Sequence, residues 1–289
     1  MQNIVSTKWL AAEIEKKNNK LVIVDTRFNL GNPLEGYHQY IEGHIPGAVY
    51  ADLEKHLSDP IDQHGGRHPL PDTDLLARNL GELGINHDSQ VVIYDDQGGM
   101  IASRLWWLLH YIGVINSAVL DGGWRKWTSE NNQISTVIPN PSVETFHPRV
   151  NPEWKWVDHR EVNKKLHHPD TILIDSRENP RYLGEFEPID PVAGHIPGAK
   201  NYFWKDVLNE EGSFKKRDEL IAYFSDVPLD KEVIVYCGSG VSACPNILAL
   251  KEAGYPNVTL YPGSWSDWIT YPDNPIAVGN ESEQDKEKR

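Results

Sequence analysis

The feature that most constrains this chain is an internal duplication. Four short sequence blocks occur twice, in the same order, in the two halves of the chain. The first block reads LVIVDTR and then TILIDSR, the second contains GHIPGA, the third is an apolar run ending in Tyr, and the fourth ends in Trp-x-x-Trp. The paired ranges are 21–27 with 171–177, 42–48 with 193–199, 91–95 with 233–237, and 119–127 with 259–268. Because four matches in one order do not arise by chance, the sequence predicts two copies of one domain.

Each copy is expected to be an α/β domain, with a mainly parallel sheet flanked by helices. The runs 91–94 and 233–236 are apolar throughout, which is typical of strands buried on both faces. Residues 72–84 place leucines at helical spacing between acidic residues and a final glycine, and 217–224 have a similar pattern. Strands that alternate with helices predict a parallel sheet covered on both faces.

The chain has 289 residues, which is more than one compact core usually holds. We place an N-terminal domain at residues 1–135 and a C-terminal domain at residues 153–280. Residues 136–152 are expected to form a linker, because the sequence there is rich in Asn, Pro, Ser and Thr and has no periodicity. Residues 281–289 are expected to form a charged tail.

Composition restricts the partners and the compartment. With 42 acidic and 28 basic residues, the formal net charge of −14 disfavours nucleic acids and anionic membranes as partners. The first residues lack the basic start and apolar run of a signal peptide, and no apolar stretch approaches the length of a membrane span. Only two cysteines are present, Cys237 and Cys244, so a disulfide framework is not expected and a reducing cytoplasm fits best.

The two copies differ in chemistry at one position. The third block ends in Asp95 in the first copy and in Cys237 in the second, where a glycine-rich segment containing Gly238 and Gly240 follows. Glycines let the backbone turn its N–H groups inward, and a helix expected to begin near Val241 would point its positive end at the same place. Both effects stabilise a negative charge on Cys237, as a nucleophilic sulfur requires.

Each cysteine also has an alternative interpretation. Cys237 could be a buried packing residue, the usual fate of a free cysteine, although packing alone does not call for Gly-x-Gly beside it. Cys244 lies on an apolar helical background and is expected to be structural. Its alternative role is a second thiol that traps Cys237 under oxidation.

Polar residues that occur in both copies are assigned to the fold. One copy has no cysteine and is expected to be inert, so a residue shared by both copies serves structure. These residues are His44, His195, Asp25, Arg27, Asp175 and Arg177. No His, Cys and Asp spacing resembles a metal site, and no phosphate-binding glycine loop is present.

With these motifs in place, the whole chain resembles the tandem-domain rhodaneses, the family of thiosulfate and mercaptopyruvate sulfurtransferases. The Asp-x-Arg, GHIPGA and Trp-x-x-Trp segments carry the resemblance. It implies an inert N-terminal domain and a catalytic C-terminal domain that carries sulfur as a persulfide on Cys237. The loop resembles the mercaptopyruvate branch, which reads Cys-Gly-Ser-Gly-Val-Thr; here Ser242 keeps the final hydroxyl. The thiosulfate branch has Arg-Lys after the cysteine, where this chain has Gly238 and Ser239.

The resemblance also implies residues that bind the donor and move its proton. Loop residues Gly238, Gly240, Val241 and Ser242 would hold the sulfur, and Arg181 would bind the anionic end of the donor. The mercaptopyruvate branch has a second arginine a few residues later, where this chain reads Glu187-Pro-Ile-Asp190. A relay of Ser239, His68 and Glu54 would complete the catalytic set, with an ordinary loop histidine as the alternative for His68.

The activity implied is a ping-pong sulfur transfer that needs no cofactor. The donor would be 3-mercaptopyruvate, with thiosulfate as the alternative, and the acceptor a small thiol, a thioredoxin-like protein or cyanide. One remaining alternative is a non-enzymatic sulfur carrier. A related cysteine-loop phosphatase or arsenate reductase is disfavoured, because its longer loop, Cys-x5-Arg, requires an arginine and residue 243 is Ala.

Overall fold

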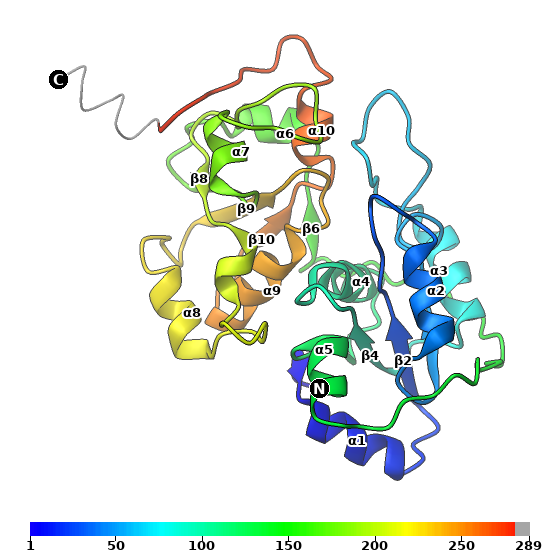
Figure 1. Cartoon of the computed structure of the whole chain (residues 1–289). Helices are drawn as coiled ribbons and strands as arrows, with labels where there is room; N and C mark the ends of the chain where they lie inside the picture. Colours follow the sequence, from blue (N-terminus) through cyan, green and yellow to red (C-terminus); the bar gives the residue numbers. More distant parts are fainter. Residues whose placement is uncertain (281–289) are drawn as a thin grey trace. The chain divides into compact units, whose positions relative to one another are not determined.

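The computed structural model describes residues 1–280 and divides into two units (Figure 1). In Figure 1 the strands of unit 1 run from blue to green and those of unit 2 from green to orange, so each sheet is made from one half of the chain. The prediction of a charged tail at 281–289 lies outside the described residues. No helix within residues 1–280 is long and apolar enough to cross a membrane.

Unit 1 is built on a five-stranded parallel sheet in the order β1-β5-β4-β2-β3. Its strands are β1 (Ile4–Val5), β2 (Leu21–Asp25), β3 (Ala48–Tyr50), β4 (Gln90–Tyr94) and β5 (Ser117–Leu120). Its helices are α1 (Thr7–Glu15), α2 (Glu35–Glu42), α3 (Thr73–Glu82), α4 (Met100–Tyr111) and α5 (Gly123–Ser129). Helix α3 begins after Asp72, whose carboxylate accepts two backbone N–H groups of the first turn, as the sequence pattern predicts.

Unit 2 repeats this arrangement with a parallel sheet in the order β6-β10-β9-β7-β8. Its strands are β6 (Lys155–Trp156), β7 (Thr171–Asp175), β8 (Lys200–Asn201), β9 (Glu232–Tyr236) and β10 (Val258–Leu260). Its helices are α6 (His159–Lys164), α7 (Asn179–Leu183), α8 (Arg217–Tyr223), α9 (Cys244–Ala253), α10 (Ser264–Trp268) and the 3-10 turn η1 (Trp204–Val207). The two matching strand orders confirm the predicted fold class and the internal repeat.

The core of each unit lies on the faces of its central strands. In β4 the side chains of Val91, Val92 and Ile93 are fully buried, because helices cover both faces of the sheet. On one face Leu10 of α1 and Trp127 of α5 pack in a cluster with Val92. Helix α4, buried along almost its whole length, packs against β4 and β5. A sheet buried on both faces explains why its strands lack polar alternation.

A buried ion pair lies at the carboxyl end of β2 in unit 1 and of β7 in unit 2. In unit 1, Nη2 of Arg27 donates to Asp25 at 2.6 Å and to the Gly43 carbonyl at 2.7 Å. The hydroxyl of Tyr94 donates to Asp25 at 2.6 Å, and the guanidinium lies 4.3 Å from the centre of the Trp124 ring. These five residues belong to the four repeated blocks, so the ion pair is the point at which all four blocks meet.

Unit 2 repeats this ion pair in the same place. Nη2 of Arg177 donates to Asp175 at 2.6 Å and to the Gly194 carbonyl at 2.7 Å. The guanidinium lies 4.7 Å from the centre of the Trp265 ring. Asp175 is fully buried and Arg177 is 2% exposed. Because water cannot solvate these charges, each is compensated mainly by the other.

The two units exchange short segments of chain. Residues 60–69 come from the first half of the sequence but belong to unit 2, and residues 208–215 come from the second half but belong to unit 1. Within unit 2, the Gly65 N–H donates to Asp267 at 2.7 Å and the Arg67 N–H donates to the hydroxyl of Ser266 at 3.1 Å. Residues 136–152, predicted as a linker, contain no helix or strand and belong to unit 1.

We expect Arg27→Ala to lower the free energy of unfolding by about 3–5 kcal/mol, because it leaves the Asp25 carboxylate buried without its cation. The measurement is chemical denaturation followed by circular dichroism. Arg78→Ala, which removes an exposed arginine of the same unit, should change this free energy by no more than about 0.5 kcal/mol. A loss below about 1 kcal/mol in Arg27→Ala would contradict a structural role for the pair.

Candidate active site

Cys237 follows the carboxyl end of β9 and begins a tight loop. Its backbone N–H donates to the hydroxyl of Ser264 at 3.0 Å, and the Gly240 N–H donates to the Cys237 sulfur at 3.2 Å. Gly240 has a φ of +76°, and a β-carbon there would lie 2.3 Å from the carbonyl oxygen of Pro262. Only glycine fits this position, so the turn that aims a backbone N–H at the sulfur depends on Gly240.

The corresponding loop of unit 1 holds a carboxylate in the position of the sulfur. Asp95 is fully buried, and its two oxygens accept four backbone N–H groups at 2.8–3.0 Å. The donors are Gln97, Gly99, Ile101 and Ala102. Burial raises the pKa of Asp95, and these hydrogen bonds oppose the rise. The loop that follows the central strand is therefore suited to hold a negative charge at its first residue.

Helix α9 begins later than the sequence pattern suggested. The prediction placed its start near Val241, but the helix begins at Cys244. The Cys244 N–H donates to the Val241 carbonyl in a turn, and Pro245, which has no N–H to donate, occupies the first turn of the helix. Cys244 is therefore the first helical residue, not one a turn or two inside, and its buried sulfur lies 3.4 Å from the Gly240 carbonyl oxygen.

The structure brings Ser239 and His68 together. The hydroxyl of Ser239 lies 2.8 Å from Nδ1 of His68, and the two residues are 7% and 3% exposed. His68 reaches the loop because residues 60–69 belong to the unit that contains Cys237. Glu54 belongs to unit 1, where it is exposed in a turn and its backbone N–H donates to Asp52 at 2.9 Å.

Two arginines lie beside the loop, although the sequence analysis identified only one. A β-carbon placed on Gly238 would lie 2.9 Å from Nη2 of Arg67 and 3.5 Å from Nη2 of Arg181. Arg181, the residue predicted to bind the donor, lies on α7. Arg67 was missed, and its position directly before His68 is the signal that could have identified it.

The segment after α7 carries acids that pair with these arginines. Glu187 accepts hydrogen bonds from Arg177 at 3.2 Å and from Arg181 at 2.7 Å, and Asp190 pairs with both Arg67 and Arg181. Burial alone would raise the pKa of Glu187, but the hydrogen bonds from Arg181 and from backbone N–H groups lower it below its ordinary value. At Asp190 burial dominates and raises the pKa, against the attraction of Arg67.

The remaining predicted loop residues precede α9. Val241 is buried and Ser242 is half-buried, and both lie between the glycine turn and the first residue of α9. The backbone of Gly238 is bonded to α10, because its carbonyl accepts the Ser266 N–H at 3.0 Å. Within residues 1–280, no group of three or more His, Cys, Asp or Glu side chains is arranged to hold a metal ion.

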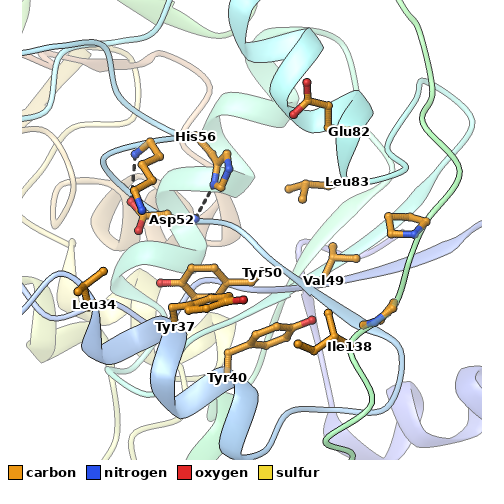
Figure 2. A pocket seen from close by; sticks show the side chains of 13 residues that line it. Leu34, Tyr37, Tyr40, Val49, Tyr50, Asp52, His56, Glu82, Leu83 and Ile138 are labelled. Carbon is orange, nitrogen blue, oxygen red and sulfur yellow. Dashed lines mark hydrogen bonds between the residues drawn. The ribbon is translucent and has the colours of Figure 1, made fainter.

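Unit 1 contains a pocket of about 340 Å³ that includes none of the predicted site residues. Three tyrosine rings, of Tyr37, Tyr40 and Tyr50, form one wall (Figure 2). On another wall the Asp52 N–H donates to Nδ1 of His56 at 2.8 Å, and burial lowers the pKa of that histidine. Its size alone suits a small molecule, but its residues offer no sulfur chemistry.

Comparison with known proteins agrees with this geometry. The family model described as the rhodanese-like domain matches the chain twice, at residues 6–130 and 158–271. A probable 3-mercaptopyruvate sulfurtransferase of Pseudomonas aeruginosa is 42% identical, over 96% of this chain and 98% of that protein. A putative thiosulfate sulfurtransferase of Mycobacterium tuberculosis, SseB, is 36% identical over 96% of this chain and 98% of its own length.

A solved structure extends the likeness to the fold. The crystal structure of SseA from Escherichia coli, described as a 3-mercaptopyruvate sulfotransferase with the rhodanese fold, superposes with a TM-score of 0.80. The alignment is 34% identical and covers 92% of this chain and 100% of that one. With both halves matched by the domain model and near full-length relatives above 30% identity, the chain belongs to the rhodanese family and is a two-domain sulfurtransferase.

Proposed function

We propose that this sulfurtransferase takes sulfur from 3-mercaptopyruvate, carries it as a persulfide on Cys237 and passes it to a thiol or to cyanide. The observation that carries the proposal is the 2.8 Å contact between Ser239 and His68 next to the cysteine. A histidine hydrogen-bonded to a hydroxyl can move a proton, which a carbon leaving group needs. The cytoplasm is the proposed compartment, because a free nucleophilic thiol survives best under reducing conditions.

In the first step the Cys237 thiolate attacks the sulfur of 3-mercaptopyruvate. A sulfur–sulfur bond forms and the bond between that sulfur and carbon 3 breaks. The bonding electrons go to the departing carbon, which becomes the enolate of pyruvate and takes one proton. We assign delivery of this proton to Ser239 and His68, which belong to the same unit. The products are pyruvate and Cys237 bearing a hydropersulfide.

In the second step a thiolate attacks the outer sulfur of the persulfide. The new sulfur–sulfur bond forms on the acceptor and the Cys237 thiolate leaves, which restores the enzyme. The backbone N–H groups of the loop stabilise the negative charge on sulfur in both steps. The Gly240 N–H at 3.2 Å from the sulfur, together with Gly238, Val241 and Ser242 around it, supports this assignment.

The donor carboxylate is assigned to Arg181 and Arg67. Their guanidinium groups flank the space over Gly238, beside the reacting sulfur. A planar guanidinium can bind a carboxylate through two parallel hydrogen bonds. The sequence predicts only Arg181 for binding the carboxylate. Arg67 supplies a second guanidinium from a different segment of the chain.

Thiosulfate is the second candidate donor, favoured by the same two arginines. Its two charges need more compensation than one carboxylate, and Gly238 and Ser239 add no cation to the loop. Its leaving group, sulfite, departs as an anion and takes no proton on carbon, so it has no use for the Ser239–His68 pair. Steady-state kinetics with both donors side by side decide between them, and we expect the higher kcat/KM with 3-mercaptopyruvate.

Cys237→Ser should abolish sulfur transfer, whereas the matched change Cys244→Ser should keep most of it. The reason is that Cys237 follows β9 and accepts the Gly240 N–H on its sulfur, whereas Cys244 is the first residue of α9. Mass spectrometry after donor treatment should find one added sulfur on Cys237. Sulfur transfer by Cys237→Ser at the wild-type rate would refute the persulfide assignment.

His68→Ala should lower kcat for 3-mercaptopyruvate by about 10²- to 10⁴-fold, the usual contribution of a general acid or base. Turnover of thiosulfate should change far less, since sulfite leaves without a proton. Ser239→Ala should reproduce this split between donors. The relay would be ruled out if His68→Ala slowed both donors equally or neither.

Arg181→Lys and Arg67→Lys should each raise KM for 3-mercaptopyruvate, by roughly tenfold, because lysine keeps the charge but loses the two-pronged hydrogen bond. The replacements with alanine should raise it further. Initial-rate kinetics provide the measurement, with Arg160→Ala, an exposed arginine of the same unit, as the control. Wild-type KM values in the alanine variants would show that the arginines do not touch the donor.

A further inference from the structure

The ion pairs around the two arginines form one continuous chain of alternating charge. It runs from Asp175 through Arg177, Glu187, Arg181 and Asp190 to Arg67, and each neighbour in this order is an ion pair. Three cations and three carboxylates balance, so the site beside Cys237 has arginine N–H groups but no net positive charge in this network. Asp190 is the member that joins its two anion-binding arginines.

Asp190 binds each arginine through one terminal nitrogen, so the other terminal nitrogen of each stays near the Gly238 position. It accepts from Nη1 of Arg67, whereas Nη2 of Arg67 is the atom nearest to Gly238. On Arg181 it accepts from Nη2 at 3.3 Å, while Nη1 of the same arginine also lies within 3.8 Å of the Gly238 position. The Asp190 carboxylate therefore holds the two guanidinium groups side by side and leaves donor atoms on the loop side.

The charge of Asp190 acts directly on whatever anion enters this space. Asp190 is only 7% exposed, so little water screens it from a bound anion. A dianion is repelled by a fixed negative charge twice as strongly as a monoanion at the same place. Removing that charge should therefore help a dianion more than a monoanion.

We propose that Asp190 determines the donor specificity of the site. Its carboxylate joins Arg67 and Arg181 and cancels one of their two positive charges. A monoanionic carboxylate donor is therefore accepted in preference to a dianionic sulfur donor. This inference rests on the proposed function, in that it assigns the anion site to the sulfur donor. It assigns Asp190 a positioning role on the arginines and an electrostatic role on the donor.

The test compares Asp190→Asn, Asp190→Ser and Asp190→Glu with the wild-type full-length enzyme, with Asp230→Asn as a control that removes an exposed acid of the same unit. Persulfide formation on Cys237 is followed with 3-mercaptopyruvate and with thiosulfate. In the Asn and Ser variants the ratio of the two kcat/KM values should move by about tenfold toward thiosulfate, as expected for one unit charge at an effective dielectric constant near 20. Asp190→Glu and Asp230→Asn should keep the wild-type ratio.

A second measurement reads the anion site without turnover. Pyruvate, a monoanion, and sulfate, a dianion, are tested for protection of Cys237 against iodoacetamide, which is itself uncharged. Sulfate should protect the Asn and Ser variants at concentrations about 100-fold lower than the wild type, and pyruvate at concentrations about tenfold lower, because the dianion interacts twice as strongly with the removed charge. A merely structural role for Asp190 would weaken both anions and both donors together.

The outcomes separate the two proposals. If the wild type forms its persulfide from 3-mercaptopyruvate but the donor ratio is unchanged in both Asn and Ser variants, the role of Asp190 is overturned and the proposed function stands. If the wild type forms no persulfide from 3-mercaptopyruvate, the proposed function falls. The shift in sulfate protection then still supports or overturns Asp190 as the residue that sets the charge preference.

Discussion

The buried aspartate–arginine pair at the carboxyl end of β2 and of β7 is the interaction on which the rest of the structure depends. Arg27 and Arg177 each bind an acid two residues earlier, a glycine carbonyl of the GHIPGA segment and the face of a tryptophan. A charge left alone in such an interior is strongly unfavourable, so neither partner can change without the other. This requirement explains why four separated blocks recur together. In unit 2 the same arginine also binds Glu187, through which the interior ion pair is connected to the residues beside Cys237.

The two copies use one loop around two different side chains. In unit 1 the loop N–H groups bind the carboxylate of Asp95, and in unit 2 the Gly240 N–H points at the sulfur of Cys237. The backbone supplies the donors in both, because the geometry comes from the strand, the turn and the following helix. The two loops therefore differ in the one side chain at the end of the strand, which is a carboxylate in unit 1 and a thiol in unit 2.

Much of this could be predicted from the sequence. The repeated blocks predicted both sheets, and the divergence between Asp95 and Cys237 located the loop, because local patterns report strands, turns and helices well. Arg67 was not identified, although it directly precedes His68, because no pattern in the sequence shows that its guanidinium lies beside Gly238. The role of Asp190 was equally hidden. The sequence shows only that an arginine is missing there, whereas the structure shows which two cations the acid joins.

The exchange of segments 60–69 and 208–215 has a consequence for how such a protein can be divided. A gene fragment that begins at the boundary between the two copies would encode every strand of the second sheet and the cysteine loop. It would not encode His68, which lies beside Ser239, or Arg67, which lies near Gly238. The second copy alone would therefore lack side chains that lie beside its cysteine loop, although it would contain the whole of its own sheet.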